Sequence, residues 1–199
     1  MFSGALPQAE AFCSLLAREA TVRGLIGPRE VPRLWERHLV NCALVAEVIP
    51  DGVTVADLGS GAGLPGLVLA IVRSDLKLTL VEPLLRRTTF LSEAVAELHL
   101  GDRVEVLRGR AEELHGSRTF DVVTSRAVAP MDRLARWSLP LVRSGGELVA
   151  MKGASAADEV ADAGSVVTEL GGELVGIDRL GAGRVDPPVT VVRVRKRTG

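Results

Sequence analysis

The sequence has no tyrosine and few side chains suited to acid–base or metal chemistry, with three histidines and two cysteines in 199 residues. Cys13 and Cys42 lie inside apolar helical patterns, without a CxxC or metal-ligand spacing, so we expect buried thiols. His38, His99 and His115 form no nucleophile or metal arrangement. The sequence therefore gives no sign of a metal site or of a nucleophile activated by histidine.

Long apolar runs and an excess of charge of one sign are also missing. The longest uncharged run, Leu58 to Val72, is too short and too interrupted by glycine and Pro65 to span a bilayer, and the N-terminus lacks the basic segment of a signal peptide. Lys+Arg 24 against Asp+Glu 25 gives a net charge of -1, which excludes the uniformly basic surface of a protein that coats nucleic acid. We expect a cytoplasmic monomer that has no contact with a membrane.

The pattern of apolar residues changes near residue 50. Two helical patterns, from Pro7 to about Val22 and from Pro28 or Glu30 to Ile49, predict an N-terminal helical extension over 1–50, followed by one α/β domain over 51–199. Seven expected strands lie at 53–58, 76–82, 103–108, 120–126, 146–152, 173–180 and 189–195. Strands alternating with helices predict a mostly parallel sheet covered on both faces. No helix fits between the last two strands, so the final strand should be antiparallel.

A glycine-rich loop follows the first expected strand and reads Asp57-x-Gly59-x-Gly61-x-Gly63. In an open α/β sheet, ligands bind beyond the carboxyl ends of the strands. Glycine supplies backbone of positive φ and lets a ligand approach closely. The loop therefore predicts a flat or extended ligand.

Two cofactors compete for this loop. The string GAGLPG, 61–66, matches GxGxxG, and Glu82 ends the second strand where a dinucleotide fold places its ribose-binding acid, which would suit a nicotinamide or flavin oxidoreductase. Asp57, however, would repel a pyrophosphate and attract a ligand that carries an amine and a sulfonium. We therefore favour S-adenosylmethionine; the other interpretation of Asp57 is a helix cap.

Two further positions suit the same cofactor. The Glu82 carboxylate can accept both ribose hydroxyls in charge-assisted bonds, or it can be a solvated acid at a strand end. In GRAEEL, 109–114, Ala111 leaves room for an adenine, and the backbone or Glu112 can bond its amino group. The same string also suits a helix N-terminus with two acids.

Six strings in a fixed order make a family resemblance visible: LWERHLVNC, DLGSGAGLPGLVLAI, LVEPLLRRTTFL, GRAEEL, FDVVTSRAVAPMDRL and GGELVAMKG. Together they resemble the glucose-inhibited division protein B (GidB) family, the RsmG methyltransferases that methylate N7 of a guanine in 16S ribosomal RNA. The resemblance covers about Pro28 to Lys152 closely and the C-terminal strand more loosely. This sequence lacks the Asn-Leu-Thr string that the family often carries between its first two helices.

The resemblance implies a seven-stranded class I, Rossmann-like S-adenosylmethionine-dependent methyltransferase fold that acts on the small ribosomal subunit. By position, the residues it implies are Gly59, Gly61, Gly63 and Leu64 as cofactor wall, Glu82 as ribose acid, Ala111 and Glu112 as adenine turn, Arg126 as the pocket arginine of a Ser-Arg-Ala motif, and Trp35, Arg37 and His38 as a W-x-RH segment. Arg86 and Arg87 should lie near the cofactor mouth or on a solvated helix turn.

Methylation of N7 sets modest chemical demands. N7 carries a lone pair and no proton, so no general base is needed, in agreement with the sequence. Arginine commonly binds guanine through O6 and N7. Since N7 must stay free, Arg126 is expected to hold either O6 or, as we prefer, the methionine carboxylate of the cofactor, because methylation leaves a cationic base. The alternative is a surface arginine at a strand end.

Two local groups of basic residues are candidates for RNA contact. The first comprises Arg23, Arg29, Arg33, Arg37 and His38; the second comprises Arg193, Arg195, Lys196 and Arg197. Localised charge suits docking to one site on a structured RNA. The second group equally suits the exposed face of a final strand, and His38 lies on an apolar stripe that suits a buried residue. A non-catalytic, methyltransferase-like RNA-binding module is disfavoured because the glycines, the acid and the adenine turn are all present.

Overall fold

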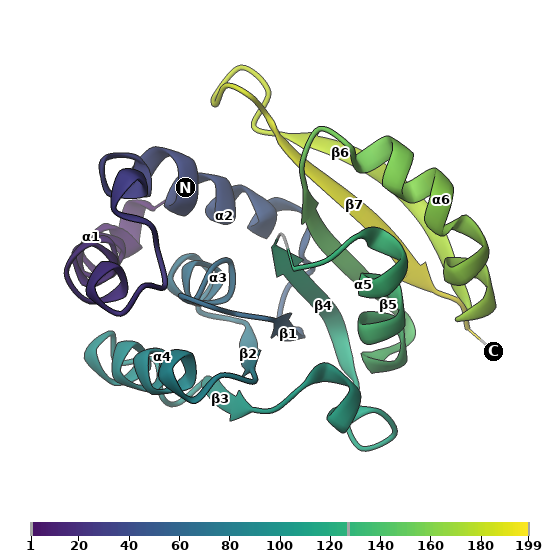
Figure 1. The fold of residues 1–199 in the computed structure, drawn as a ribbon, viewed down its shortest axis with the longest axis horizontal. Coiled ribbons are helices and arrows are strands. Elements are labelled where there is room, and N and C mark those ends of the chain that lie inside the picture. The colour runs from purple at the N-terminus through teal and green to yellow at the C-terminus, as the bar shows by residue number, and fades with distance from the viewer. Residues whose placement is uncertain (1, 127, 199) are drawn as a thin grey trace.

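The computed structural model describes residues 2–126 and 128–198, which build a seven-stranded sheet flanked by helices. Its strands, in sheet order, are β3 (Val104–Arg108), β2 (Lys77–Glu82), β1 (Thr54–Leu58), β4 (Phe120–Arg126), β5 (Val142–Lys152), β7 (Val189–Lys196) and β6 (Gly172–Leu180) (Figure 1). The pairs among β1 to β5 are parallel, and β7 is antiparallel to both its neighbours. The predicted mostly parallel sheet with an antiparallel last strand is confirmed.

Helices cover both faces of this sheet, as the alternating pattern predicts. One face carries α1 (Leu6–Leu15), α2 (Asn41–Leu44), α3 (Gly66–Val72) and α4 (Leu85–Glu97), and the other carries α5 (Met131–Ser138) and α6 (Ala156–Glu169) (Figure 1). Three-residue to four-residue 3-10 turns lie at Ser3–Ala5, Ala111–Leu114 and Leu139–Leu141. Each face buries its own apolar cluster, because successive strand residues point to opposite sides.

The N-terminal helices are less regular than their apolar periodicity predicts. After α1 the chain makes a π turn at Leu16–Ala20, and the second helical segment consists of a 3-10 piece at Pro28–Arg33, a π piece at Leu34–Val40, α2, and a 3-10 turn at Val45–Val48. Pro32 lies inside the first piece, where it offers no N–H donor and disfavours a regular α-helix. The whole segment packs into the same cluster as the sheet, with Phe12 and Leu39 fully buried beside Val55.

The carboxyl ends of the central strands lie at one edge of the sheet. Leu58 pairs with Val81, and Arg126 pairs with Met151, so the residues that follow β1, β2, β4 and β5 share this edge. The order of strands reverses between β1 and β4, where open α/β sheets leave a ligand crevice.

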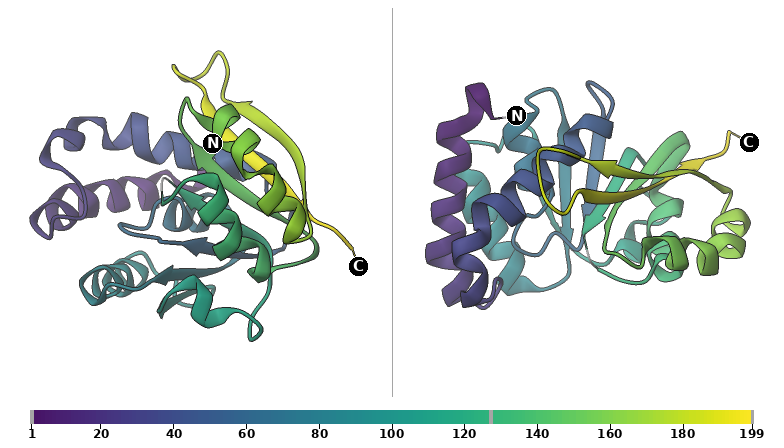
Figure 2. Two further views of the ribbon diagram at one scale, coloured as in Figure 1. Left: turned by 45° about the vertical axis from the view of Figure 1, so that its right-hand side comes forward. Right: turned by 90° about the horizontal axis from the view of Figure 1, so that it is seen from above.

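The β6–β7 hairpin returns to the same edge. Lys152 at the end of β5 pairs with Thr190, just after the connecting loop at 181–188. That loop packs on the N-terminal helices, since Arg184 donates two hydrogen bonds of 2.7 and 2.8 Å to the Glu47 carboxylate (Figure 2). Within the described ranges, no helix has the length and apolar character that a bilayer crossing requires.

Candidate active site

The glycine-rich loop leaves β1 and is fastened to β2 by its own backbone. The N–H groups of Gly59 and Ser60 donate to the Val81 carbonyl at 2.9 and 3.2 Å. Gly59, Gly61 and Gly63 have φ of +68°, +58° and +87°, which is the left-handed region that side chains disfavour. At Gly59 a Cβ would also lie 2.9 Å from Val128 Cγ2, so the glycine is required for close approach as well as for the turn.

Asp57 is fully buried beneath this loop and caps α3. Its Oδ2 accepts the Gly66 N–H at 2.9 Å, and its Oδ1 has no hydrogen-bond partner among the described residues. Burial raises the pKa of Asp57 to about 7, against the opposing effect of the Gly66 N–H. The contact that the structure gives Asp57 is therefore the helix cap, and an influence on a cationic ligand stays a prediction.

A cavity of about 570 Å³ opens at the carboxyl ends of β1, β2 and β4. Five predicted cofactor residues line it together: Gly59, Glu82, Ala111, Glu112 and Arg126. The other predicted cofactor residues do not line this cavity; they are Gly61, Gly63, Leu64 and Asp57. They can affect it only through the conformation of the glycine-rich loop. Of the two arginines expected near its mouth, Arg87 lines it and Arg86 does not.

Glu82 is the most buried carboxylate in the cavity wall, with a side chain 1% exposed. Its Oε2 accepts the Gly61 N–H at 3.0 Å, its Oε1 accepts the Leu84 N–H at 3.1 Å, and the Arg87 Nη1 lies 3.5 Å from Oε2. The interpretation of Glu82 as a solvated acid is therefore wrong. Each carboxylate oxygen has two lone pairs, so Oε1 can still accept a hydroxyl, whereas Oε2 can do so in place of its long contact with Arg87.

Arg126 ends β4 and points toward the N-terminal helices. Its Nη2 lies 2.6 Å from His38 Nδ1, and its Nη1 donates weakly to Cys42 Sγ at 3.5 Å. His38 in turn lies 2.9 Å from Glu30 Oε2 through Nε2. Arg126 is thus held by buried partners and borders the cavity, which excludes the interpretation as a free surface arginine. Ala127, the last residue of the Ser-Arg-Ala motif, lies outside the described residues.

The two predicted basic groups lie apart. Arg193 and Arg195 both lie 2.7 Å from Glu147 oxygens, in the half of β7 remote from the cavity, and Arg197 donates to the Thr168 carbonyl. Lys196 donates to the Leu170 carbonyl. Their arrangement is that of a paired strand face, and an RNA contact by them stays a prediction.

The first basic group is divided as well. Arg23 joins the π turn at Leu16–Ala20 to α4 through Glu19 and Glu93 and lies over the Phe90 ring, away from the cavity. His38 is buried, as its apolar stripe predicts, whereas Arg33 and Arg37 are exposed. Arg37 has only a distant ion pair, 3.8 Å from Glu30. RNA contact by Arg33, Arg37 or His38 stays a prediction.

Several residues of the cavity wall were not singled out in the sequence, among them one with a large flat side chain. Trp137 on α5 and Val128 after β4 both line the cavity. Trp137 could have been noticed in the sequence, because it is one of two tryptophans and lies in the helix that follows the strand of Arg126. Its flat side chain suits a wall against which a flat ligand packs. In the described ranges no group of three or more His, Cys, Asp or Glu side chains could hold a metal ion.

Known proteins resemble this chain in sequence and in fold. A family model described as GidB, rRNA small subunit methyltransferase G, matches residues 5–185. The chain belongs to the GidB family. Two curated relatives named ribosomal RNA small subunit methyltransferase G are 58% identical over 202 residues, from Salinispora tropica, and 62% identical over 192 residues, from Nocardioides sp.. The alignments cover 98% and 96% of this chain, and 84% and 76% of the relatives.

Solved structures resemble the chain at the level of the fold. The mitomycin 7-O-methyltransferase MmcR matches with a TM-score of 0.67 at 19% identity, over 93% of this chain and 60% of that one. TYW2 of Pyrococcus horikoshii, solved in complex with MeSAdo, matches with a TM-score of 0.61 at 16% identity, over 79% of this chain and 62% of that one. The predicted class I, Rossmann-like methyltransferase fold is confirmed, and the GidB relatives identify an rRNA methyltransferase.

Proposed function

We propose that this protein uses S-adenosylmethionine to methylate N7 of a guanine in the 16S RNA of the small ribosomal subunit. The observation that carries the proposal is the joint placement of Glu82, the Ala111–Leu114 turn and Arg126 around one cavity at the point where the strand order reverses. The cavity volume of about 570 Å³ lies within the usual range for cofactor sites. Membership of the GidB family supports rRNA as the class of substrate.

The residues of the cavity fit this cofactor. Glu82 is buried, carries a carboxylate and faces the cavity, which suits a pair of ribose hydroxyls. Ala111 offers a small side chain beside it for a flat base, and the missing Cβ of Gly59 keeps the wall open next to Val128. Arg126 would hold the methionine carboxylate, because a guanidinium is matched to a carboxylate and would oppose the charge of a methylated guanine.

When bound, S-adenosylmethionine supplies a methyl group on a sulfonium, which an unprotonated lone pair can take in one in-line displacement. The protein therefore needs to place N7 and exclude water rather than move a proton. Such positioning can contribute roughly 7 to 11 kcal/mol toward lowering a barrier. The absence of tyrosine and the burial of His38 between Glu30 and Arg126 agree with a site that has no general base at N7.

The test is transfer of tritiated methyl from S-adenosylmethionine to small subunits from a strain that lacks this protein, with deproteinised 16S RNA assayed in parallel. Borohydride reduction and aniline cleavage then map the site. Incorporation with one new cleavage at a guanine is the expected result. Incorporation without cleavage would contradict N7, and cofactor binding without incorporation into any RNA would favour a non-catalytic binding module.

A further inference from the structure

A second cavity, of about 690 Å³, adjoins the cofactor cavity. The two share Arg126 and Val128, so the end of β4 forms the partition between them. The substrate of a methyl transfer must reach the cofactor from an adjoining space. This second cavity is the adjoining space that the structure provides.

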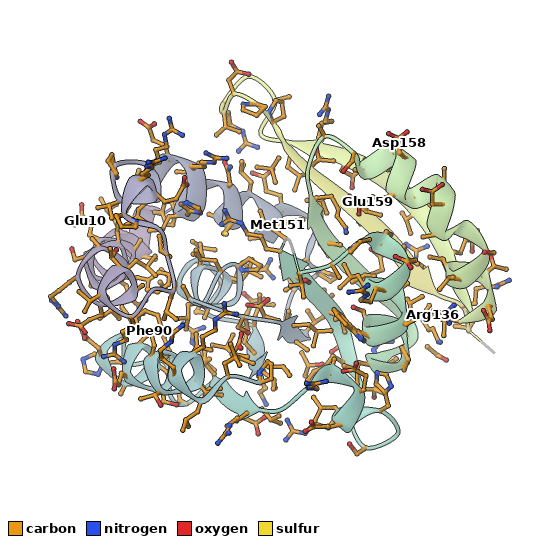
Figure 3. The ribbon with its side chains drawn as sticks, in the orientation of Figure 1. Glu10, Phe90, Arg136, Met151, Asp158 and Glu159 are labelled. Carbon is orange, nitrogen blue, oxygen red and sulfur yellow. The ribbon has the colours of Figure 1, made fainter. Side chains whose placement is uncertain are left out.

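Segments distant in the sequence build its walls, and four of them supply most of the lining residues. They are the N-terminal helices with Arg37, the loop after β4 with Pro130, the end of β5 with Met151, and the β6–β7 hairpin with Arg179. Figure 3 labels Met151 near the centre of the molecule, where β5 ends, with Glu159 of α6 nearby. The cavity therefore combines apolar walls with several polar and charged side chains, as a site for a polar nucleotide requires.

One of its cations is already neutralised. Lys152 Nζ donates to the Ala129 carbonyl at 2.6 Å and to Glu159 Oε2 at 2.8 Å, and its side chain is 5% exposed. Lys152 thus fastens the loop after β4 to α6 and shapes the wall. It does not add positive charge for a ligand.

Two other cations remain available at the cavity. The Arg37 side chain is 57% exposed, and its Nη1 lies as far as 3.8 Å from the carboxylate of Glu30. Arg179 is exposed as well and has a single weak contact, 3.4 Å from its Nη1 to Thr190 Oγ1. In the described part of the chain Arg179 forms no ion pair. The contrast is with Arg193 and Arg195, which share the Glu147 carboxylate at 2.7 Å.

We propose that the second cavity receives the target guanosine nucleotide, and that Arg37 and Arg179 bind the RNA phosphates that flank it. This inference rests on the proposed function and extends it to a site. The base would lie against the wall formed by Met151 and Val128. The hairpin, which the sequence presents as a structural end of the sheet, thereby becomes part of the substrate site.

A variant that fills the cavity tests the position of the base. Gly153 lines the cavity, and a Cβ added there meets no atom within 4 Å, so the backbone leaves room for a side chain to start there and Gly153→Trp would direct an indole into the cavity. The matched control is Gly164→Trp on α6, where a Cβ also meets nothing and which does not line either cavity. We expect G153W to lower kcat/KM for RNA by about 100-fold, as misplaced reactants do, without changing the affinity for S-adenosylhomocysteine. G164W should change neither.

Variants of the two arginines test the phosphate contacts. Arg37→Gln and Arg179→Gln are compared with Arg136→Gln, an exposed arginine on α5 outside both cavities, labelled in Figure 3. Filter binding of 16S RNA is measured from low to high salt. Each cavity variant should weaken binding and reduce the slope of log Kd against log salt by about 1, and R136Q should leave the slope unchanged.

The outcomes separate this inference from the proposed function. Wild-type rates in G153W, or unchanged salt slopes in both R37Q and R179Q, would overturn the second cavity as the substrate site while leaving methyl transfer intact. A different result would support the site and contradict the proposed reaction: the wild type binds RNA but transfers no methyl, and the R37Q and R179Q variants show the reduced salt slope.

Discussion

Arg126 Nη2 and His38 Nδ1 lie 2.6 Å apart, and this contact ties the end of β4 to the N-terminal helices. An arginine can only donate, so Nδ1 must accept, and the proton of the neutral ring lies on Nε2, where it is donated to Glu30 Oε2 at 2.9 Å. Burial, together with the Arg126 charge, lowers the pKa of His38 below its usual value. The neutral ring orients the one arginine that borders both cavities.

His38 therefore makes stability depend on pH. Because its pKa is lowered on folding, the unfolded chain binds more protons as the pH falls through about 6.5. The free energy of unfolding should be fully retained above that pH and decrease below it. Urea denaturation at pH 7.5 and 5.5 measures the change, and His38→Asn, which keeps an acceptor for Arg126 without a titrating ring, should show a smaller decrease.

His38→Ala distinguishes positioning from packing. It leaves the Arg126 Nη2 and Glu30 without this partner, at a cost of about 1 to 2 kcal/mol in the free energy of unfolding. We expect H38A to lower kcat more than H38N does, because only H38N can still accept from Arg126. Equal kcat in the two variants, at equal stability, would show that the acceptor does not matter.

Gly59 and Gly52 offer a matched pair for the cofactor loop. Their φ values are +68° and +67°, so alanine at either position should lower the free energy of unfolding by about 1 to 2 kcal/mol. Only at Gly59 does the new Cβ meet a neighbour, Val128, in the cavity wall. Calorimetry should show weaker binding of S-adenosylhomocysteine in Gly59→Ala alone, and equal affinities in both variants would contradict this role.

Glu82→Gln separates charge from shape at the proposed ribose site. The Glu82 carboxylate accepts N–H groups of Gly61 and Leu84 on its two oxygens, and an amide has only one oxygen for them. Loss of charge-assisted bonds to ribose should reduce cofactor affinity about tenfold. The measurement compares S-adenosylhomocysteine with its 2′,3′-dideoxy analogue, which the wild type should bind more weakly and E82Q should scarcely distinguish.

Two aspartates should show opposite dependence on pH. Burial raises the pKa of Asp57 to about 7, so its contribution to stability is complete below about 3.8 and is lost as the pH rises through 7. Asp57→Asn keeps an acceptor for the Gly66 N–H and removes the ionisation. Its stability relative to the wild type should therefore increase between pH 4 and pH 8, as followed by urea denaturation.

Asp121 is the control for this measurement. Burial raises its pKa, but hydrogen bonds from Thr54 and Arg143 outweigh burial and lower the pKa to about 2. Its contribution is complete above the usual aspartate pKa and is lost as the pH falls toward 2. Asp121→Asn should be less stable than the wild type by a constant amount above pH 4, with the difference narrowing in acid. The same pH trend in both variants would contradict the assignment for Asp57.

The central strands were predictable because their signal is local. The expected 120–126 is β4 as observed, and 53–58 and 76–82 differ from β1 and β2 by one residue. Buried parallel strands are short runs of branched apolar residues that end in glycine or charge. The prediction was wrong at the start of β5, which is set by pairing with a neighbouring strand. β5 begins at Val142 rather than at 146, and its register with β4 is irregular in this part.

The cofactor site was predictable for a related reason. Parallel strands bring their carboxyl ends to one edge, so Gly59, Glu82, Ala111 and Arg126 had to converge once the strands were recognised. The sequence by itself thus determined the strands, the glycine loop, the edge at which the cavity lies and, through its motifs, the family. These properties depend on residues close together in the chain.

Only the tertiary structure decided which charges are free to act. It paired Arg193 and Arg195 with Glu147, placed His38 between Glu30 and Arg126, and brought Arg179 of the hairpin into the wall of the same cavity as the end of β4. Apart from the contact between His38 and Glu30, eight positions apart, these relationships join residues far apart in the chain. A charged side chain contributes to a site only through the partners around it, and those partners are set by how the sheet and helices pack.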